Sequence, residues 1–369
     1  MMTTPDPRMK TLLRLKTPLR SYQFSIEAFG IAFTYLIVLF LPACDGREIV
    51  GDVVAIETTF PCMGTSVSLK TFSDDSEHVQ KVFEDARNEI DRLVAIFTDY
   101  KQDSEVCRLT GEDRIKQWQA VSPELWELLK ISDDWHRASG GAFDVSIGQL
   151  SILWREARSR DEIPSSAQIA KAKSLCGWEH VELDHTNHSV RINLTGLRLD
   201  FGSVAKGYII EQAYQFLSAN GLPSSMVRAG GDLRCGTSPP GRQGWRIEIE
   251  NVDDSQHERS RYLISNAAIS SSGDRYQYIE IDGKRRSHVI DPRTGIGVEG
   301  PTLVTVVAAT ATEADVSDTA ICVMGHDAGM RLARNRPELK VRIMSMITSD
   351  DSGKIRVSQT GFDSLVPLP

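Results

Sequence analysis

Apolar side chains recur every three or four residues in several parts of the chain, which is the spacing of a helix with one buried face. The clearest case lies between 79 and 97, where the apolar positions are Val79, Val82, Phe83, Ala86, Ile90, Leu93, Val94 and Phe97. Ser122 and Pro123 form a good cap and first turn for a second helix, which should end before Gly140-Gly141. The expected helices cover about 79–97, 122–138, 165–175, 203–220 and 311–324.

Other stretches alternate apolar and polar residues or hold short apolar runs, and these predict strands. They cover about 53–58, 66–72, 179–183, 189–193, 225–229, 245–250, 262–271, 275–282 and 302–309. The strands do not alternate regularly with helices, and the middle of the chain holds several strands in succession. This order favours an α+β fold with a largely antiparallel sheet over a doubly wound parallel sheet.

The first 43 residues differ in composition from the rest of the chain. Residues 1–20 hold five basic side chains against one acidic one, and Ala28–Leu41 is an uncharged run of 14 residues. That run is short for crossing a hydrocarbon core, which takes about 20 helical residues, so the pattern is typical of a secretory signal. The run ends in Leu41-Pro42-Ala43-Cys44, which resembles the lipobox of bacterial lipoproteins. We therefore expect a signal segment over 1–43 and a mature domain over 44–369.

The lipobox resemblance implies that Cys44 is acylated, becomes the first mature residue and anchors the protein to a membrane. Asp45 resembles the signal that keeps such lipoproteins at the inner membrane. An uncleaved N-terminal anchor is the alternative interpretation. Either interpretation places the remaining chain outside the cytoplasm. With the Asp45 resemblance, we expect a lipid-anchored protein at the bacterial inner membrane that faces the periplasm.

Charge and cysteine content narrow the possible partners. Without residues 1–43 the formal charge changes from −8 to −11, from 37 Lys plus Arg against 48 Asp plus Glu. No basic patch remains that would suit a phosphate backbone, so nucleic acid is not an expected partner.

Five cysteines follow Cys44, in odd number and without CxxC spacing, so the chain is not a disulfide scaffold. About 325 residues allow either two lobes or one elaborate domain.

Polar residues cluster at the start of the helix expected from Ser203, in "LDFGSVAKGYIIEQA" at 199–213. Free backbone N–H groups at a helix start favour an anion, and Lys206 adds a positive charge in the first turn. Because a lysine at that end opposes the helix dipole, it indicates a negative partner. The alternative is that Asp200 only caps the helix and Lys206 is solvated.

Two further clusters surround expected turns. The stretch "VRAGGDLRCGT" at 227–237 has paired glycines beside Asp232 and Arg234, which a tight turn alone would also explain. The stretch "ISSSGDRYQYIEIDGKRRSHVIDPRTG" at 269–295 predicts a hairpin with Asp282-Gly283 at its turn. Such a hairpin would place residues 271–274 near His288 and Asp291. The alternative is a surface hairpin whose histidine has no function.

The helix expected over 311–324 contains "ATEADVSDTAICVMG" at 311–325. Asp315 and Thr319 are four residues apart and share a face, and Asp318 lies beside them. Two carboxylates and a hydroxyl in one turn are hard oxygen ligands of the kind that suit Mg²⁺. The alternative is that these polar side chains only cap the helix or face solvent. The apolar residues around them make that alternative weaker.

The clusters match one family in their order as well as their content. The mature chain resembles the FAD:protein FMN transferases, the ApbE family, along nearly its whole length. Seven stretches carry the resemblance: "MGTSVSL" at 63–69, "FTDYKQDSEVCRL" at 97–109, "GGAFDVSIGQL" at 140–150, "LDFGSVAKGY" at 199–208, "AGGDLRCG" at 229–236, "SSGDRYQYIEIDGKRRSHVIDPRTG" at 271–295 and "ATEADVSDTAICVMG" at 311–325. The resemblance implies a T-fold-like α+β fold, with a mostly antiparallel sheet flanked by helices. It also implies an enzyme that uses FAD as substrate and Mg²⁺ as cofactor, moves FMN onto a Thr or Ser hydroxyl of a target flavoprotein, and releases AMP.

The resemblance carries site residues onto this chain by motif. The expected FAD site is lined by Met63, Tyr100, Ala142, Phe143, Asp144, Asp200, Lys206 and Ile290. The expected metal ligands are Asp315, Asp318 and Thr319, with an oxygen of Ser203 as a further candidate. The chain departs from the common family pattern in "FDVSIG", where many members have a proline after the aspartate, and at Phe201 and Ser203.

The expected chemistry is phosphoryl transfer, in which neutralising the pyrophosphate charge with Mg²⁺ and Lys206 provides most of the rate gain. An unactivated hydroxyl is a poor nucleophile, so we expect His288 to accept its proton while Asp291 orients the turn. Asp274 is a weaker alternative base. An FAD pyrophosphatase that gives FMN and AMP, and a non-catalytic flavin-binding lipoprotein, are the rival functions. The expected acceptor is a membrane redox subunit or a secreted flavoprotein.

Overall fold

The computed structural model describes residues 49–50, 53–160, 162–250, 260–274, 278–281, 284–300, 302–346 and 355–368. The expected signal over 1–43, with its apolar run and the residues 41–44, lies outside this part of the chain. Among the described residues, none of the helices combines the length and the apolar character that a bilayer crossing requires.

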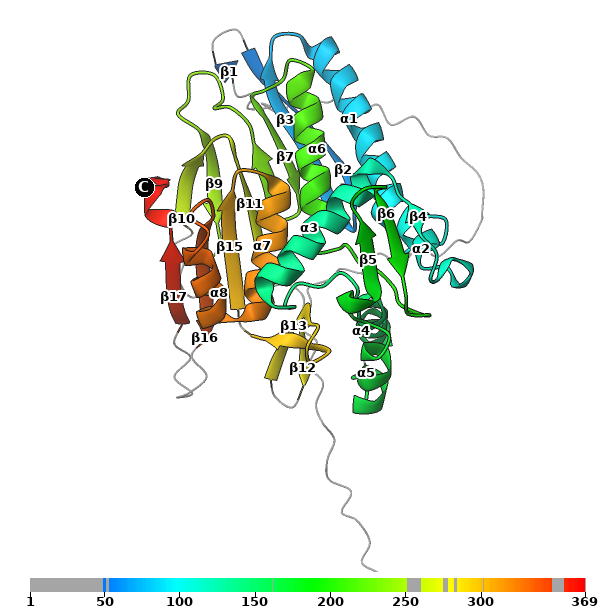
Figure 1. Ribbon diagram of the computed structural model, residues 1–369. Helices are drawn as coiled ribbons and strands as arrows, with labels where there is room; N and C mark the ends of the chain where they lie inside the picture. The colour runs from blue at the N-terminus through cyan, green and yellow to red at the C-terminus, as the bar shows by residue number, and fades with distance from the viewer. Residues whose placement is uncertain are drawn as a thin grey trace, which may run out of the picture.

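A nine-stranded sheet forms the centre of the molecule (Figure 1). Its order is β1-β2-β3-β7-β8-β11-β15-β16-β17, and every neighbouring pair is antiparallel. The strands are β1 Ile49–Val50, β2 Val53–Cys62, β3 Thr65–Ser73, β7 Ser225–Ala229, β8 Asp232–Cys235, β11 Ala267–Gly273, β15 Thr302–Ala308, β16 Lys340–Met346 and β17 Ile355–Thr360. The expected antiparallel sheet is therefore confirmed.

Helices cover one face of this sheet (Figure 1). They are α1 Ser76–Phe97, α3 Pro123–Ser139, α6 Ala205–Ala219, α7 Ala311–Met324 and α8 His326–Arg334. The apolar stripe read from the sequence is the buried face of α1, apart from Val94, which is partly buried. Ser122 caps α3 as expected, since its side chain accepts a hydrogen bond from the N–H of Leu125.

Both faces of the large sheet pack against other layers. In β15 the side chains of Val304 and Val306 join the main core under the helices, whereas Val307 belongs to a second core on the opposite face. This alternation follows from the two-residue period of a strand. A smaller sheet, in the order β18-β10-β9, supplies the second core with Trp245 and Ile264. Its strands are β9 Trp245–Ile249, β10 Ser260–Ile264 and β18 Val366–Leu368.

The single strand expected over 262–271 is two strands in the structure. Asn266 adopts a positive φ of 50° between β10 and β11, and its N–H donates to the carbonyl of Gly236. The break sends β10 into the smaller sheet and β11 into the large one. The hydrophobic pattern did not reveal it, because both strands are apolar and only one residue at the junction turns the chain.

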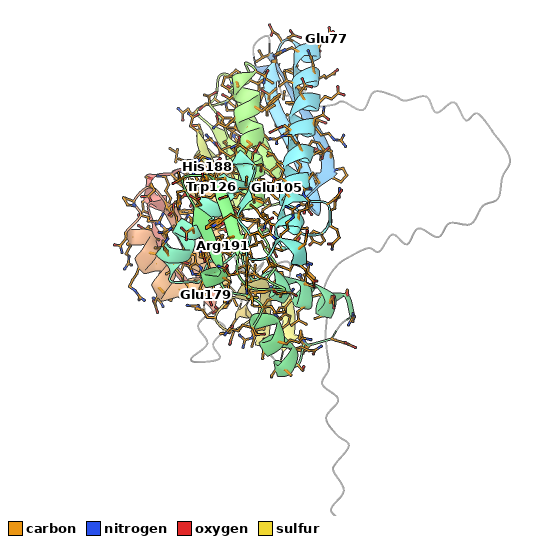
Figure 2. The ribbon with its side chains drawn as sticks, turned by 45° about the vertical axis from the view of Figure 1, so that its right-hand side comes forward. Glu77, Glu105, Trp126, Glu179, His188 and Arg191 are labelled. Atoms are coloured by element: carbon orange, nitrogen blue, oxygen red, sulfur yellow. The ribbon has the colours of Figure 1, made fainter. Side chains whose placement is uncertain are left out.

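Two further small sheets complete the strands. One has the order β4-β6-β5, from β4 Gln119–Ala120, β5 Val181–Asp184 and β6 Ser189–Ile192. Beside it, Trp126 of α3 stacks on His188 with ring centroids 5.1 Å apart (Figure 2). The other has the order β12-β13-β14, from β12 Tyr278–Ile281, β13 Lys284–Asp291 and β14 Ile296–Glu299. The expected hairpin is confirmed by the pairing of Ile281 with Lys284, although its turn, 282–283, lies outside the described residues.

Three short or medium helices lie near these sheets: α2 Glu105–Leu109, α4 Gly148–Arg160 and α5 Ser166–Lys173, of which only α5 was expected. The 3₁₀ turns are Glu112–Arg114, Trp178–His180 and Phe362–Ser364. The cysteines of the described chain are all free, and three of them, Cys107, Cys235 and Cys322, are buried. Buried unpaired cysteines of this kind pack as small apolar residues.

Candidate functional site

The start of α6 meets the middle of α7, and this contact joins two of the polar clusters identified in the sequence. Lys206 lies in the first turn of α6 and forms ion pairs with Asp232 of β8 and with Asp315 of α7, whose Oδ1 is 3.6 Å from the lysine Nζ. Burial alone would lower the pKa of Lys206, but the carboxylates of Asp232 and Asp315 raise it overall. The negative partner expected for this lysine is thus supplied by the chain itself.

Asp232 is held from both sides. Its Oδ1 accepts hydrogen bonds from the hydroxyl of Ser270 at 2.7 Å and from the N–H of Ser271 at 3.3 Å. Its exposed fraction is 3%, so the ion pair with Lys206 is buried on the carboxylate side. The sequence analysis assigned Asp232 no role. The only signal was its place beside the paired glycines, which a tight turn explained equally well.

Asp318, Thr319 and Ser272 form the other half of the cluster. The Ser272 hydroxyl donates to Asp318 Oδ1 at 2.8 Å and lies 3.2 Å from the Thr319 hydroxyl. Ser270 and Ser272 face these helices because they are two residues apart on β11 and share one side of the sheet. Asp318 Oδ2 is buried and has no hydrogen-bond partner among the described residues.

Three carboxylates thus surround one ammonium group in a buried place, and we call Lys206, Asp232, Asp315 and Asp318 the acid cluster. Burial raises the pKa of Asp315 to about 6, although the positive charge of Lys206 acts to lower it. Burial, together with the charges of Asp315 and Asp232, raises the pKa of Asp318 well above its usual range. Burial is the main cause of both shifts, and a buried carboxylate is stabilised in its charged form by a neighbouring cation.

The donors fit Mg²⁺ in their chemistry. Asp315, Asp318 and Thr319 offer hard oxygens, and the unpartnered Asp318 oxygen has no other bond to lose. Ser203 lies partly exposed in the turn just before α6. No three His, Cys, Asp or Glu side chains of the described chain lie close enough to hold a metal by themselves. The remaining ligands would therefore come from hydroxyls, backbone or a phosphate substrate.

His288 is an exposed residue of β13. It lines a cavity of about 10 Å³, room for about one water, together with Trp154, Tyr278 and Ile290. Asp291 lies three residues further on and forms hydrogen bonds with the turn that follows it. Its Oδ1 accepts from the N–H of Arg293 at 2.9 Å and from Arg293 Nε at 2.8 Å. Arg293 also donates to the carbonyl of Val323 at 3.0 Å, which ties this turn to the end of α7.

Asp274, the alternative base, is engaged within the protein. Its exposed fraction is 1%, and its Oδ2 forms an ion pair with Arg285 at 2.6 Å. Its Oδ1 accepts from the N–H of Thr302 at 2.9 Å, while burial raises the pKa of the carboxyl group. The geometry makes Asp274 a link between the end of β11, the start of β15 and β13.

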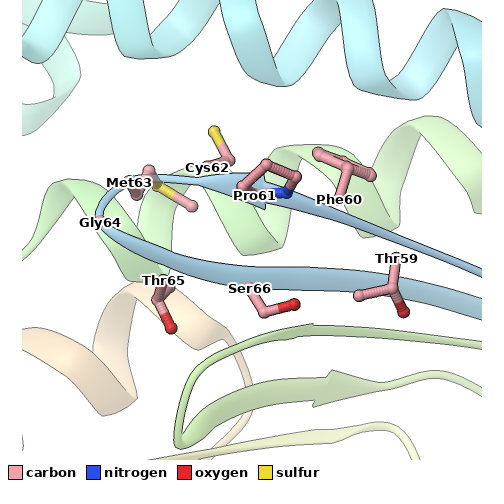
Figure 3. Close-up of a pocket in the computed structure, with 8 residues that line it drawn as sticks. All are labelled: Thr59, Phe60, Pro61, Cys62, Met63, Gly64, Thr65 and Ser66. Atoms are coloured by element: carbon pink, nitrogen blue, oxygen red, sulfur yellow. The ribbon is translucent and has the colours of Figure 1, made fainter. Parts of the chain in front are cut away.

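Met63 lies at the tip of the β2–β3 hairpin with a φ of 51°. The tip borders an open hollow of about 650 Å³, which among the described residues is lined by 59–66 (Figure 3). Cys62 points from the hairpin toward α1, and Thr65 points toward the β7–β8 turn (Figure 3). The N–H of Gly230, in that turn, donates to the carbonyl of Ser66 at 3.1 Å and so ties the turn to the hairpin. Asp232 follows directly after the turn. The hollow therefore lies beside the strand that carries part of the acid cluster.

Tyr100 and Asp200 lie near one arginine that the sequence analysis missed. Tyr100 is 75% exposed, and the Arg155 guanidinium lies over its ring, 4.4 Å from the centroid. Arg155 forms an ion pair with Asp99, and the charge of Asp200 helps to raise its pKa. Asp200 does not cap α6; its Oδ1 accepts from the N–H of Gly202 at 2.8 Å, two residues before the helix cap at Val204. Arg155 was missed because α4 was not expected.

The remaining predicted flavin-site residues are largely interior. Ala142 and Phe143 are each 1% exposed as whole residues, so neither offers appreciable surface to a ligand in this structure. Asp144 Oδ1 accepts from the N–H of Ser146 at 2.7 Å and from its hydroxyl at 2.5 Å. Burial raises the pKa of Asp144 despite these bonds. The ligand contacts assigned to these three residues stay predictions.

Residues 63–343 match the ApbE family. The chain is 28% identical over 305 residues to the FAD:protein FMN transferase of Escherichia coli K12, covering 80% of this chain and 87% of the relative. It is 30% identical over 281 residues to the FAD:protein FMN transferase of Salmonella typhimurium, covering 74% of this chain and 79% of the relative.

Solved structures agree with the sequence matches. The flavin transferase ApbE from Vibrio cholerae superposes with a TM-score of 0.76 at 25% identity, covering 85% of this chain and all of that one. The apo form of the Pseudomonas stutzeri flavinyl transferase ApbE gives a TM-score of 0.74 at 27% identity, with 85% and 98% covered. The expected α+β fold with its mostly antiparallel sheet is confirmed.

Proposed function

The chain belongs to the ApbE family, and on that basis we propose that it is an FAD:protein FMN transferase that requires Mg²⁺. It moves the FMN half of FAD onto a Thr or Ser hydroxyl of a target flavoprotein. A phosphoester forms between that hydroxyl oxygen and the FMN phosphorus, the pyrophosphate bond breaks, and AMP leaves. The hydroxyl proton goes to a base on the enzyme.

The observation that carries this proposal is the acid cluster with its unpartnered oxygen. A buried carboxylate oxygen without a hydrogen bond costs free energy unless a cation or proton satisfies it. Asp318 Oδ2 is such an atom, while the other oxygen of Asp318 accepts from Ser272, whose hydroxyl also contacts that of Thr319. Asp315 lies one helical turn earlier on α7. Asp315, Asp318 and Thr319 would hold Mg²⁺, with an oxygen of Ser203 as a fourth ligand. The bound ion would neutralise pyrophosphate charge that otherwise repels the nucleophile.

The chain's own residues divide the remaining work. Lys206 has its ammonium between Asp232 and Asp315, so it holds both carboxylates in place and adds positive charge beside the phosphates. His288 accepts the proton of the acceptor hydroxyl. Asp291 keeps the turn after His288 in one conformation through its bonds to Arg293. The exposure of His288 leaves room for the hydroxyl of a protein substrate to approach.

The flavin would extend from the acid cluster toward surrounding residues: Met63, Tyr100, Ala142, Phe143, Asp144, Asp200 and Ile290. The support for this placement is geometric. The hairpin tip of Met63 is bonded to the turn before Asp232, and Tyr100 presents an exposed aromatic ring under Arg155. An aromatic face beside a guanidinium suits a flat conjugated ring system.

We further propose that the protein is a lipoprotein, anchored through Cys44 to the inner membrane and facing the periplasm. The support is the order of basic stretch, short apolar run and Leu41-Pro42-Ala43-Cys44 in the sequence. Its acceptor would then be a membrane redox subunit or a secreted flavoprotein. Treating the expressed lipoprotein with a lipase and following its release from membranes tests the anchor.

The activity is tested by incubating the protein with FAD, Mg²⁺ and a flavoprotein domain that carries a Ser/Thr-containing acceptor motif. Flavin fluorescence that stays with the acceptor on a denaturing gel, with one AMP released per label, supports transfer. AMP without label would mean that the protein is an FAD pyrophosphatase. Neither product would mean that it binds flavin without turning it over.

A further inference from the structure

The strand that carries His288 is irregular at that residue. On β14, Glu299 pairs with Arg286 and Gly297 pairs with Ile290, so three residues of β13 oppose one residue of β14. Residues 287–289 therefore form a β-bulge, and the bulge interrupts the ladder of hydrogen bonds on that side. Bulges of this kind re-aim a side chain, and here the exposed residue in the middle of the bulge is His288.

The side chain of Ser287 holds this bulge. Its hydroxyl oxygen accepts a hydrogen bond from the N–H of Val289 at 3.0 Å and donates to the carbonyl of Gly273 at 3.3 Å. The bond to Val289 spans two residues and closes a tight turn around His288. Ser287 is 8% exposed, so water does not compete freely for these bonds.

The backbone beside Ser287 is also closely packed. A Cβ at Gly297 would lie 2.0 Å from the carbonyl oxygen of Ser287. Only a glycine there allows β14 to approach the bulge. Two contacts therefore fix the backbone of the bulge: the close approach of Gly297 to the Ser287 carbonyl, and the hydrogen bond from Val289 to the Ser287 hydroxyl.

The second bond of Ser287 leads toward the acid cluster. Gly273 ends β11, and the preceding residue, Ser272, places its hydroxyl on Asp318 and Thr319. The end of β11 therefore has two hydrogen bonds. The carbonyl of Gly273 accepts from Ser287 in the bulge, and the hydroxyl of Ser272 donates to Asp318 in the acid cluster. Two hydrogen bonds, from Ser287 to Gly273 and from Ser272 to Asp318, therefore connect the bulge with the expected metal ligands.

We propose that Ser287 is a positioning residue for flavin transfer: its hydroxyl sets the bulge, and through it the direction of the His288 imidazole relative to the acid cluster. The inference rests on the proposed function, because it gives His288 the role of base. In this proposal Ser287 acts on the reaction only through the position of His288. A side chain misplaced by about 1 Å lowers a rate by up to about 100-fold.

The test compares three variants. Ser287→Ala removes the hydroxyl, Ser287→Thr keeps it, and Ser225→Ala is the matched control. Ser225 is a fully buried strand residue whose hydroxyl donates to the carbonyl of Leu222 at 2.7 Å, away from the acid cluster. Thermal unfolding of each variant shows whether it is folded. Labelling is then measured at saturating FAD and acceptor, and Mg²⁺-dependent FAD binding is measured by calorimetry.

We expect Ser287→Ala to lower kcat by about 10- to 100-fold with unchanged FAD affinity, and Ser287→Thr to restore most of it. Combined with His288→Ala, the Ser287→Ala change should slow labelling no further, because it acts through His288. Two outcomes would overturn the proposal. One is a double variant whose rate falls by the product of the two single effects, and the other is a Ser287→Ala rate equal to that of Ser225→Ala.

A readout independent of activity separates this inference from the proposed function. In ¹H–¹³C spectra of histidine-labelled protein, the His288 ring signal is identified by its loss in His288→Gln. Ser287→Ala should shift or broaden that signal while Ser225→Ala leaves it unchanged, and an unchanged signal in both would refute the positioning role. If wild-type protein labels no acceptor while the signal still shifts, the proposed function fails and the positioning of His288 stands.

Discussion

The backbone N–H of Gly207 donates a hydrogen bond of 2.6 Å to Oδ2 of Asp315. The contact exists because Gly207 has no Cβ: one built there would lie 2.3 Å from the carbonyl oxygen of Ala311 and 2.5 Å from Cβ of Asp315. The first turn of α6 therefore approaches α7 closely enough for a free N–H group to hold the carboxylate. The neighbouring Lys206 is brought to the same carboxylate from the other side.

Replacing Gly207 with Ala should separate the two helices. We expect the added methyl to destabilise the fold by about 1–3 kcal/mol, measured by urea unfolding, and to weaken Mg²⁺-dependent FAD binding because Asp315 moves. Gly231→Ala is the matched control, since a Cβ at Gly231 meets nothing within 4 Å and its φ is not positive. Equal stability of the two variants would contradict the close approach.

Asp315→Asn should remove one charge from the expected metal ligands without changing their shape. Calorimetry should show Mg²⁺-dependent FAD uptake weakened by about 100-fold, with labelling lost in parallel. Asp327→Asn is the control, because Asp327 pairs with Arg356 at the exposed start of α8. Wild-type uptake by the Asp315 variant would remove the metal assignment.

His288→Ala should lower the labelling rate by about 10²–10⁴-fold while FAD binding stays intact, because only the proton acceptor is lost. His78→Ala provides the comparison: His78 lies on α1 and its Nε2 contacts the carbonyl of Asn220. Labelling at the wild-type rate would exclude His288 as the base.

His326 should make stability depend on pH. Its ring nitrogens contact the hydroxyls of Ser345 and Ser358 at 2.7 and 2.9 Å, and burial, followed by the charge of Arg356, lowers its pKa. Because the unfolded chain then binds the proton more tightly, this contribution is present above the usual pKa of 6.5 and is lost as the pH falls through the lowered value.

The free energy of unfolding should therefore decrease between pH 7.5 and pH 5, and His326→Gln should show a smaller decrease. Urea titrations at several pH values measure both slopes. Parallel slopes in the two proteins would show that His326 is not the group responsible.

Arg234 and Glu211 form a buried ion pair, with Arg234 Nε 3.1 Å from Glu211 Oε2. The same Glu211 oxygen accepts from the N–H of Ala311 at 2.9 Å, so it also stabilises the start of α7. Arg234→Met should destabilise the protein by about 3–5 kcal/mol, because Glu211 is left buried and charged. The double variant with Glu211→Gln should lose less than the sum of the single changes, as measured by a double-mutant cycle.

Local pattern made much of the fold predictable. The apolar stripe of α1, the Ser122 cap of α3 and the alternation in β15 depend on neighbours a few residues away, so the sequence shows them directly. The succession of strands predicted an antiparallel sheet, which the structure confirms. The expected strand over 262–271 failed at Asn266, where one positive φ changes the sheet to which the chain belongs.

For the site, the sequence by itself determined which residue types are available and in what local order: Asp315, Asp318 and Thr319 in one helical turn, and His288 three residues before Asp291. Tertiary structure alone decided their partners. It paired Lys206 with Asp232, bonded Ser272 to Asp318, and shifted the register between β13 and β14 at residues 287–289. Contacts of this kind join residues far apart in the chain, and no local periodicity encodes them, because they depend on how closely whole helices and strands pack.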